Sequence, residues 1–333
     1  MTHIEQIVNV LKDHRVFIQT HNTPDPDALA SAYGLQYLLS TFGIMSTIVY
    51  DGEINKISGL KLLEYLDFTV VPYKEVKNLS EEDYVVLVDS QKYNRNCTDI
   101  PGDEVVCIDH HPTFYDCEYQ FKDVRIVGSC SSLICSYFIE AGIEMNSDVA
   151  TALLYGLKTD TADFNRGVTD FDLEMFQYLF KLADDDILRR ISVNSIALSD
   201  LKAYGAAIND ITVYKSIGFA CIPFNCPDAL VAIISDFILA LDVIGFSVVF
   251  CERNGGYKFS IRSEIQEINC GSIVSYVMSE LGGNGGGHGF MSGGFIPEEA
   301  VRSLGRNPRK EIEFEFMRAL YPEDFPGSSK VIG

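Results

Sequence analysis

The chain contains no tryptophan and few basic residues: 26 lysines and arginines stand against 47 aspartates and glutamates in 333 residues. The resulting net charge of −21 repels long nucleic acids, unless positive charge is concentrated in one place or metal ions neutralise the site locally. This balance argues against a processive nuclease with a long basic channel. It remains compatible with a small anionic substrate that metal ions hold.

Long apolar runs are also missing. The most apolar stretch, residues 230–244, is interrupted by Asp236 and Asp242 and is too short to cross a membrane. No signal peptide is recognisable, and the nine cysteines form no CxxC pair. An odd number of cysteines without a secretory signal is typical of a reducing compartment. We therefore expect a soluble cytoplasmic protein whose cysteines mostly serve as small core residues.

Several catalytic motifs are absent as well. Neither zinc-finger spacing nor an HExxH motif occurs, which argues against a structural zinc site. No G-x-S-x-G elbow accompanies Ser31 or Ser90, which disfavours a Ser-His-Asp hydrolase. The glycine-rich loop at residues 282–289 lacks the Lys-Ser/Thr pair of a Walker A motif. Its glycines would still let backbone N–H groups approach an anion, with His288 as a further donor.

The first half of the chain alternates short apolar runs with helical patterns. Near-continuous runs such as residues 85–88 are typical of parallel strands that are buried on both faces. Strands are predicted at residues 16–20, 47–50, 84–88, 105–108 and 124–126, and helices at residues 27–42, 57–66, 131–141, 147–157 and 171–182. This alternation predicts an α/β fold with a doubly wound, mostly parallel sheet over residues 1–185.

The second half is predicted to be a smaller α/β domain over residues 210–333, joined to the first by a helical linker over residues 186–209. Strands are predicted at residues 211–222, 246–251 and 257–261, with a hairpin turn at Asn254-Gly255-Gly256. Helices are predicted at residues 227–241, 270–281, 297–304 and 309–320. The chain is long enough to bury two cores.

The heptapeptide His21-Asn22-Thr23-Pro24-Asp25-Pro26-Asp27 directly follows the first predicted strand. It places an imidazole and two carboxylates at the carboxyl end of that strand, where open α/β sheets bind their ligands. Nitrogen and oxygen donors at this close spacing, stiffened by two prolines, suit a divalent metal. Because Asp and Pro are also common turn residues, a capped strand–helix turn is the alternative interpretation.

Polar side chains end several other apolar segments in the same way. Asp89 ends the strand at residues 84–88, Asp109-His110-His111 follows the strand at 105–108, and Asp160 follows the apolar segment 152–157. Each Asp alone could be a helix N-cap, but the strand ends of a doubly wound sheet meet at one edge. We therefore predict two divalent ions that share a carboxylate. The predicted cluster comprises His21, Asp25, Asp27, Asp89, Asp109, His110, His111 and Asp160.

These motifs stand in the order found in the DHH/DHHA1 phosphoesterases, which the chain resembles over residues 5–297. It is most similar to the stand-alone NrnA-like oligoribonucleases and cyclic-dinucleotide phosphodiesterases. The N-terminal matches are His21-x-x-x-Asp25-x-Asp27-Ala28, Asp89-Ser90, Asp109-His110-His111-Pro112 and Thr159-Asp160-Thr161. The C-terminal matches are Phe259-Ser260-Ile261-Arg262-Ser263, Asn269-Cys270-Gly271 and Gly285-Gly286-Gly287-His288. The chain departs from the family at Ala162, where glycine is frequent, and at Met291-Ser292, where small residues are frequent.

The resemblance implies a role for each matched residue. One metal ion would be bound by His21, Asp25 and Asp89, and the second by Asp27, Asp89, His110 and Asp160. The implied catalytic residues are Asp89, Asp109, which orients an imidazole, and His111, which contacts the scissile phosphate. The implied substrate-binding residues are His111, Arg262, Ser263, Gly286, Gly287 and His288, across a cleft between the two domains that holds the active site. Apart from the resemblance, the neighbouring sequence leaves two interpretations of Arg262 open: its guanidinium could bind a phosphate, or it could form a surface salt bridge.

The implied enzyme is a phosphodiesterase or phosphatase in which two divalent ions, usually Mn²⁺, activate a bridging hydroxide. The expected substrates are nanoRNA and dinucleotides, cyclic or linear dinucleotides such as c-di-AMP and pApA, or 3′-phosphoadenosine 5′-phosphate. An inorganic pyrophosphatase or exopolyphosphatase, which shares the N-terminal motifs, is the alternative enzyme. The alternative that is not an enzyme is a catalytically dead cyclic-dinucleotide binding protein, although the sequence lacks none of the expected metal-binding residues. Neither a membrane nor a long nucleic acid is expected as a partner, and the resemblance allows a homodimer.

Overall fold

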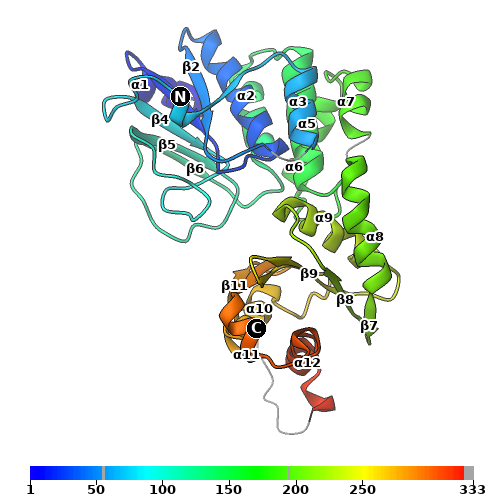
Figure 1. The fold of residues 1–333 in the computed structure, drawn as a ribbon. Helices are drawn as coiled ribbons and strands as arrows, with labels where there is room; N and C mark the ends of the chain where they lie inside the picture. The colour runs from blue at the N-terminus through cyan, green and yellow to red at the C-terminus, as the bar shows by residue number, and fades with distance from the viewer. Residues whose placement is uncertain (55–56, 194–195, 326–333) are drawn as a thin grey trace. The chain divides into compact units, whose positions relative to one another are not determined.

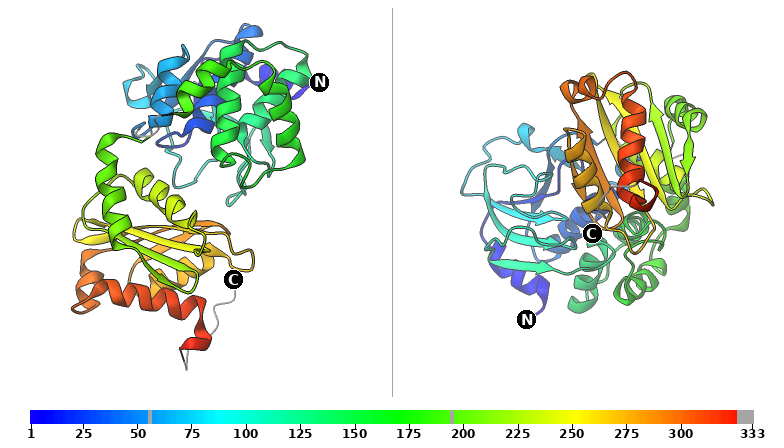
Figure 2. Two further views of the ribbon diagram at one scale, coloured as in Figure 1. Left: turned by 90° about the vertical axis from the view of Figure 1, so that its right-hand side faces the viewer. Right: turned by 90° about the horizontal axis from the view of Figure 1, so that it is seen from below.

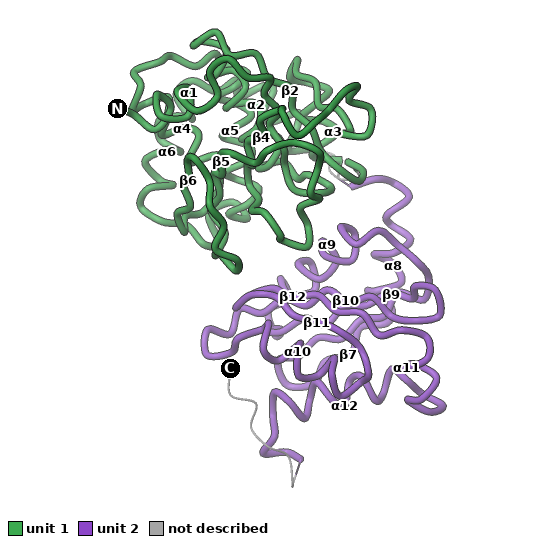
Figure 3. Tube along the Cα trace, turned by 90° about the vertical axis from the view of Figure 1, so that its left-hand side faces the viewer, with its two compact units in different colours: residues 1–195 green, residues 196–333 purple. Residues whose placement is uncertain are grey.

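The structure, a computed structural model, describes residues 1–54, 57–193 and 196–325. The chain divides into two compact units, Met1–Ser195 and Ile196–Gly333, which Figure 3 draws in different colours. Residues 55–56, 194–195 and 326–333, which include part of the predicted linker and the end of the predicted second domain, lie outside the described residues. Each unit has its own sheet and its own hydrophobic core.

The sheet of the first unit has six parallel strands in the order β3-β2-β1-β4-β5-β6 (Figure 1). The strands are β1 Val16–Gln19, β2 Ser46–Tyr50, β3 Val70–Pro72, β4 Tyr84–Val88, β5 Asp103–Asp109 and β6 Phe121–Val124. The strand order reverses between β1 and β4, and open α/β sheets bind ligands at such a switch point. The predicted α/β class and parallel sheet are confirmed.

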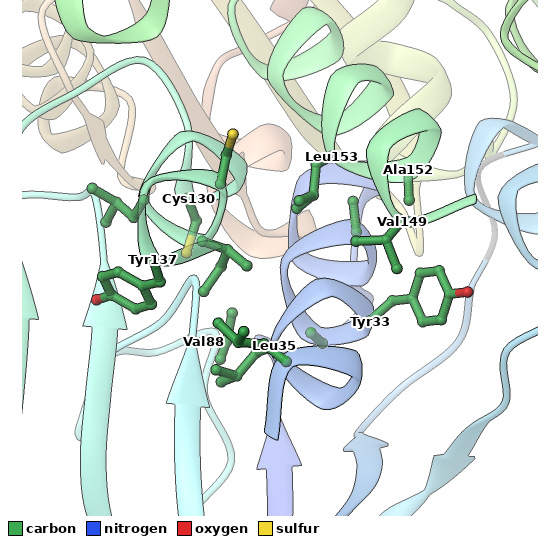
Figure 4. Packing of buried hydrophobic residues seen from close by; sticks show 14 of the residues in the cluster. Tyr33, Leu35, Val88, Cys130, Tyr137, Val149, Ala152 and Leu153 are labelled. Carbon is green, nitrogen blue, oxygen red and sulfur yellow. The ribbon is translucent and has the colours of Figure 1, made fainter. Parts of the chain in front are cut away.

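Helices cover one face of this sheet. They are α1 His3–Leu11, α2 Pro26–Thr41, α3 Ile57–Tyr65, α4 Cys130–Ala141, α5 Ser147–Asp160, α6 Asp170–Phe180 and α7 Asp185–Ser192. Helix α2 packs against strands β1, β2 and β4 and also against α4 and α5, so nearly all of its sides are buried. Figure 4 shows this core with Tyr33 of α2 beside Val149 of α5, and Leu35 of α2 beside Val88 of β4. A helix that is apolar all round is stable only in such a central position.

Loops and a short 3₁₀-helix, rather than a second layer of α-helices, cover the opposite face of the sheet. Because side chains alternate along a strand, Val86 and Val88 of β4 point into the helical core, while Val85 and Leu87 point the other way. The residues that cover this second face come from loops and from the short 3₁₀-helix η1 Tyr73–Glu75: Tyr73, Val76, Leu79, Cys97, Ile100 and Tyr119. The strand order is therefore that of a doubly wound sheet, but loops replace the expected helices on one side.

The sheet of the second unit is mixed, with the strand order β11-β12-β10-β9-β8-β7 and only β8 and β9 parallel. The strands are β7 Thr212–Tyr214, β8 Ile217–Ile222, β9 Phe246–Arg253, β10 Gly256–Ser263, β11 Asn284–Gly287 and β12 Met291–Ile296. Helices α8 Leu201–Asp210 and α9 Asp228–Leu239 pack on one face, and α10 Cys270–Glu280 and α12 Pro308–Leu320 on the other (Figure 2). The remaining elements are α11 Glu298–Ser303, η2 Leu198–Asp200 and η3 Pro322–Asp324.

The structure corrects several expected elements. The strand predicted at residues 211–222 is a hairpin of β7 and β8, because Lys215 turns the chain with a φ of +50°. The glycine-rich loop contains the edge strand β11, which pairs with β12. Strand β6 ends at Val124, where the predicted strand begins, and the short β3 was not predicted. The turn at Asn254-Gly255 is confirmed, with φ values of +49° and +76° that suit a tight hairpin.

The described parts of the predicted linker at residues 186–209 are mostly helical. They belong to α7, which ends at Ser192, and to η2 and α8, which begin at Leu198. Within the ranges that the structure describes, no helix has both the length and the apolar character that a membrane crossing requires.

Candidate metal centre

The segment between β1 and α2 forms the first part of the site. Asp25 is the N-cap of α2, and its Oδ1 accepts hydrogen bonds from the backbone N–H groups of Asp27 and Ala28, at 3.0 and 3.2 Å. Pro26 occupies the first helical position, where its fixed φ fits the helix and its missing N–H costs nothing. The Nδ1 atom of His21 donates to the carbonyl of Asn22 at 2.9 Å, which turns Nε2 toward the carboxylates. The segment is therefore a capped turn that also presents polar groups.

Asp89 ends β4 in an unusual backbone conformation. Its φ is +56°, and a residue other than glycine in this region costs about 1–3 kcal/mol. Its N–H donates to the carbonyl of Ile108 in β5 at 2.9 Å, and its side chain is only 3% exposed. Such strain collects at functional sites, where the surrounding structure holds a side chain in a required direction.

The segment Asp109-His110-His111 ends β5. The Oδ1 atom of the buried Asp109 accepts hydrogen bonds from the backbone N–H of His110 at 2.8 Å and from Nδ1 of His111 at 2.9 Å. His110 donates from its own Nδ1 to the carbonyl of Val127 at 3.0 Å, so its Nε2 faces the cluster. His111 is 43% exposed, which makes it the most accessible side chain of the predicted metal cluster.

Asp160 reaches the site from a helix rather than from a strand. Helix α5 extends to Asp160, beyond its predicted end at residue 157. The Oδ2 atom of Asp160 lies 3.4 Å from Nε2 of His110. Arg166 donates to the backbone carbonyl of Asp160 at 2.7 Å, and its guanidinium lies 3.9 Å from Oδ1. One corner of the site therefore depends on the position of α5 and not on the strand ends.

Asp27 is 1% exposed and lies at the N-terminus of α4. Its two oxygens accept hydrogen bonds from the backbone N–H groups of Cys130 and Ser131, at 2.8 and 2.9 Å. Gly156 of α5 lies so close that a Cβ there would be 3.0 Å from Asp27 Oδ1 and 2.3 Å from Ser131 Oγ. Each carboxylate oxygen has two lone pairs, so Asp27 can cap α4 and still offer a lone pair to a cation.

The six predicted metal ligands converge in two groups that share Asp89. In the first group, Nε2 of His21 lies 3.8 Å from Asp25 Oδ1 and 3.6 Å from Asp89 Oδ2. In the second group, Nε2 of His110 lies 3.2 Å from Asp89 Oδ1, 3.4 Å from Asp160 Oδ2 and 3.9 Å from Asp27 Oδ2. The two oxygens of Asp89 thus face different groups, which is the arrangement that a bridging carboxylate requires.

The cluster attracts positive charge. Asp89 Oδ1 and His110 Nε2 are both buried, and neither makes a hydrogen bond among the described residues. Burial and then the neighbouring carboxylates raise the pKa of Asp27 well above its usual value and the pKa of Asp160 to about 6. Burial lowers the pKa of His21, but the hydrogen bond with Asp25 and the charges of Asp25 and Asp89 outweigh it and raise that pKa to about 9. These oxygen and nitrogen donors fit divalent ions such as Mn²⁺ or Mg²⁺.

The predicted substrate-binding residues of the second unit lie at one end of three neighbouring strands. Arg262 and Ser263 end β10, Gly286 and Gly287 end β11, and β12 begins between these two strands. His288 follows β11, and its N–H donates to the carbonyl of the first residue of β12 at 2.8 Å. The structure therefore brings these five residues of the second unit together.

The guanidinium of Arg262 is held in place from several directions. Its Nε donates to Oδ1 of Asp236 on α9 at 2.7 Å, and its Nη1 donates to the Ser260 hydroxyl and to the carbonyl of Ile261 at 3.1 and 3.0 Å. The Arg262 side chain is 13% exposed. The salt bridge considered from the sequence exists, and it fixes the orientation of the guanidinium, whose Nη2 takes no part in these contacts.

Comparison with known families assigns both units. Residues 15–157 match the DHH family, N-terminal domain, and residues 215–307 match the DHHA1 domain. The chain contains a DHH domain and a DHHA1 domain. All of the predicted metal ligands except Asp160 lie within the range that matches the DHH domain, and Arg262 and His288 lie within the DHHA1 domain.

Individual relatives are similar to different extents of the chain. An uncharacterised protein of Methanocaldococcus jannaschii, MJ1633, is 29% identical over 87% of this chain and 61% of its own length. A probable manganese-dependent inorganic pyrophosphatase of Streptococcus thermophilus is 31% identical over 44% of this chain and 48% of its own length. The chain thus spans about half to three fifths of these relatives. The fold is similar to that of an exopolyphosphatase-related protein from Bacteroides fragilis, with a TM-score of 0.73, 20% identity, and coverage of 94% of this chain and 97% of the other.

Gln91 belongs to the site of the DHH domain, although the sequence did not predict it. The side chain is 2% exposed, and its Nε2 donates to Asp109 Oδ2 at 2.7 Å and to the carbonyl of His111 at 3.1 Å. Gln91 thereby holds one oxygen of the carboxylate whose other oxygen binds the His111 ring. Its place two residues after Asp89 was the only signal in the sequence, because an amide neither titrates nor has the pattern of a metal ligand.

Replacing Gln91 by Met is expected to lower kcat of the hydrolysis proposed below by about 10–100-fold, as is typical when a supporting partner of a site residue is lost. KM and the number of bound metal ions should change little, because Gln91 touches no predicted metal ligand. Gln36→Met is the matched control, since Gln36 also donates from a partly buried Nε2, to the carbonyl of Ser46 at 2.9 Å. Steady-state kinetics in which both variants retain wild-type kcat would contradict this role.

Proposed function

We propose that the protein is a hydrolase that uses two divalent metal ions, with Mn²⁺ as the first candidate, to cleave phosphoester bonds in short nucleotides. The observation that carries the proposal is the position of Asp89, whose two oxygens face two separate groups of imidazole and carboxylate ligands. The similarity of part of the chain to probable manganese-dependent pyrophosphatases supports manganese and chemistry at a phosphate. A cytoplasmic location and a homodimer stay predictions.

Six side chains would hold the ions. His21, Asp25 and Asp89 are proposed for one ion, and Asp27, Asp89, His110 and Asp160 for the other. When bound, such ions lower the pKa of water and stabilise negative charge on phosphoryl oxygens. The hydrogen bonds at Nδ1 of His21 and of His110 fix each ring so that Nε2 points toward the ions.

His111 is proposed to contact the scissile phosphate. Burial lowers the pKa of its imidazole, but the hydrogen bond to Asp109 and the charge of Asp89 outweigh that effect and raise it above its usual value. A protonated His111 can donate from Nε2 to a phosphoryl oxygen while its Nδ1 stays bound to Asp109 at 2.9 Å. Gln91, Asp109 and His111 thus form a chain that positions this donor.

The DHHA1 domain is proposed to bind the rest of the substrate. The chain carries a net charge of −21, so an anionic substrate needs a fixed positive group beyond the ions, and the oriented guanidinium of Arg262 is suited to a phosphate. Ser263, Gly286, Gly287 and His288 would complete this contact. The candidate substrates are nanoRNA and dinucleotides, cyclic or linear dinucleotides such as c-di-AMP and pApA, and 3′-phosphoadenosine 5′-phosphate.

An inorganic pyrophosphatase or exopolyphosphatase is the second candidate, because probable manganese-dependent pyrophosphatases are among the relatives. The similarity to them covers only 44% of the chain, so it leaves the substrate undecided. The test is to compare kcat/KM with Mn²⁺ for pApA, c-di-AMP, a ladder of two- to five-nucleotide RNAs, the bisphosphate, pyrophosphate and polyphosphate. A nucleotide should be the best substrate. Faster cleavage of pyrophosphate or polyphosphate would favour the second candidate, and tight nucleotide binding without hydrolysis would indicate a binding protein.

A further inference from the structure

The tip of the hairpin between β11 and β12 is held from two sides. The first two N–H groups of α10 donate to the carbonyls of Gly289 and His288, at 2.9 and 3.0 Å. On the other side, the N–H of Ser263 at the end of β10 donates to the carbonyl of Phe290 at 2.9 Å. Three consecutive carbonyls of this tip are therefore bound to neighbouring elements, and the tip is fixed to the strand that carries Arg262.

The packing around this tip leaves no room for a side chain at Gly271 of α10 or at Gly287 of β11. A Cβ at Gly271 in α10 would lie 2.4 Å from the carbonyl oxygen of Gly287, and a Cβ at Gly287 would lie 2.3 Å from the carbonyl oxygen of Met291. Both distances are far shorter than a van der Waals contact. The close approach of α10 to the end of β11, and of β11 to the start of β12, makes the hairpin tip a rigid support.

Phe290 is the large apolar side chain on this support, and it is 50% exposed. It lies two residues from His288 and directly before Met291, which is paired with Arg262 between β12 and β10. An exposed Phe alone is an ordinary surface feature. Here the aromatic residue belongs to a tip that also carries His288 and is bound to the strand of Arg262, so one substrate can reach both.

We propose that Phe290 is a specificity-determining residue that stacks on a base of the substrate and so selects nucleoside-bearing phosphoesters over inorganic phosphates. The inference rests on the proposed function and deepens it, because it assigns the recognition of the base to this residue. Every nucleobase offers a π face to an aromatic ring, so the contact tolerates different bases. Arg262 and His288 would hold a phosphate while Phe290 covers the adjoining base.

The test compares wild type, Phe290→Ala, Phe290→Tyr and the control Phe314→Ala. The control removes another partly exposed phenylalanine ring, which lies on α12 and is 40% exposed. The substrates are pApA and two analogues that each lack one base. Phe290→Ala should raise KM for pApA by about 5–150-fold, the range that a lost base–aromatic stack gives. The KM values of Phe290→Tyr and Phe314→Ala for pApA should stay within about twofold of the wild-type value, since both variants keep an aromatic ring at position 290.

The analogues separate stacking from a general loss of structure. For the analogue without the stacked base, wild type and Phe290→Ala should have the same KM, whereas damage to the fold would lower activity on all three substrates alike. Equal KM values of wild type and Phe290→Ala for pApA would overturn the inference while leaving the proposed function standing. Wild-type protein that cleaves pyrophosphate but none of the nucleotides would instead overturn the proposed function, and the inference with it.

Discussion

Asp89→Asn is expected to lower kcat of the manganese-supported hydrolysis about 10³-fold, since metal ions contribute several kcal/mol to the stabilisation of charge at a phosphoryl group. The substitution keeps the shape of the side chain but removes the negative charge of the carboxylate. The two oxygens of that carboxylate lie 3.6 Å from Nε2 of His21 and 3.2 Å from Nε2 of His110. An amide also ligates Mn²⁺ more weakly than a carboxylate does. Steady-state rates at saturating Mn²⁺ measure this effect.

Asp163→Asn is the matched control for this experiment. Asp163 lies three residues beyond Asp160, but its side chain is 73% exposed and pairs with Lys158 at 3.1 Å, outside the cluster. An exposed pair of this kind contributes little, so kcat should stay within about twofold of wild type. Undiminished turnover of Asp89→Asn beside an unchanged control would contradict the assignment of Asp89 as the shared ligand.

Removal of divalent ions by a chelator is expected to abolish activity, and Mn²⁺ should restore it. Ions that bind only the folded state at 100 times their Kd stabilise it by about 2.7 kcal/mol, which raises Tm by several degrees in a domain of this size. Affinity should increase as pH rises, because the ligands must lose protons: the pKa of Asp160 is raised to about 6 and that of His21 to about 9. Thermal melts with and without Mn²⁺ at several pH values measure both effects. Full activity of the chelated protein would contradict the account.

The sequence was most informative where residues close in the chain decide the structure. The polar segments after β1, β4 and β5 directly follow buried strands, so the meeting of His21, Asp89 and His110 follows from the parallel sheet alone. The hairpin turn at Asn254-Gly255 is equally local, because both residues tolerate positive φ. For these elements, periodicity and turn chemistry were sufficient.

The missed features depend on contacts between distant parts of the chain. Asp27 accepts its hydrogen bonds from α4, 103 and 104 residues away, and Gln91 donates to Asp109, which lies 18 residues away at the end of β5. The end of α5 could not be placed from the apolar pattern, because Lys158 to Asp160 are polar and still helical. The glycines of β11 have no β-propensity of their own, and pairing with β12 makes them a strand.

Electron paramagnetic resonance of the wild-type protein with two equivalents of Mn²⁺ tests the central claim most directly. If Asp89 is shared by two ions, the spectrum should be that of an exchange-coupled pair, and Asp89→Asn should replace it with the signal of isolated ions. Binding that saturates at one ion, or two ions that remain magnetically independent in the wild type, would contradict the account.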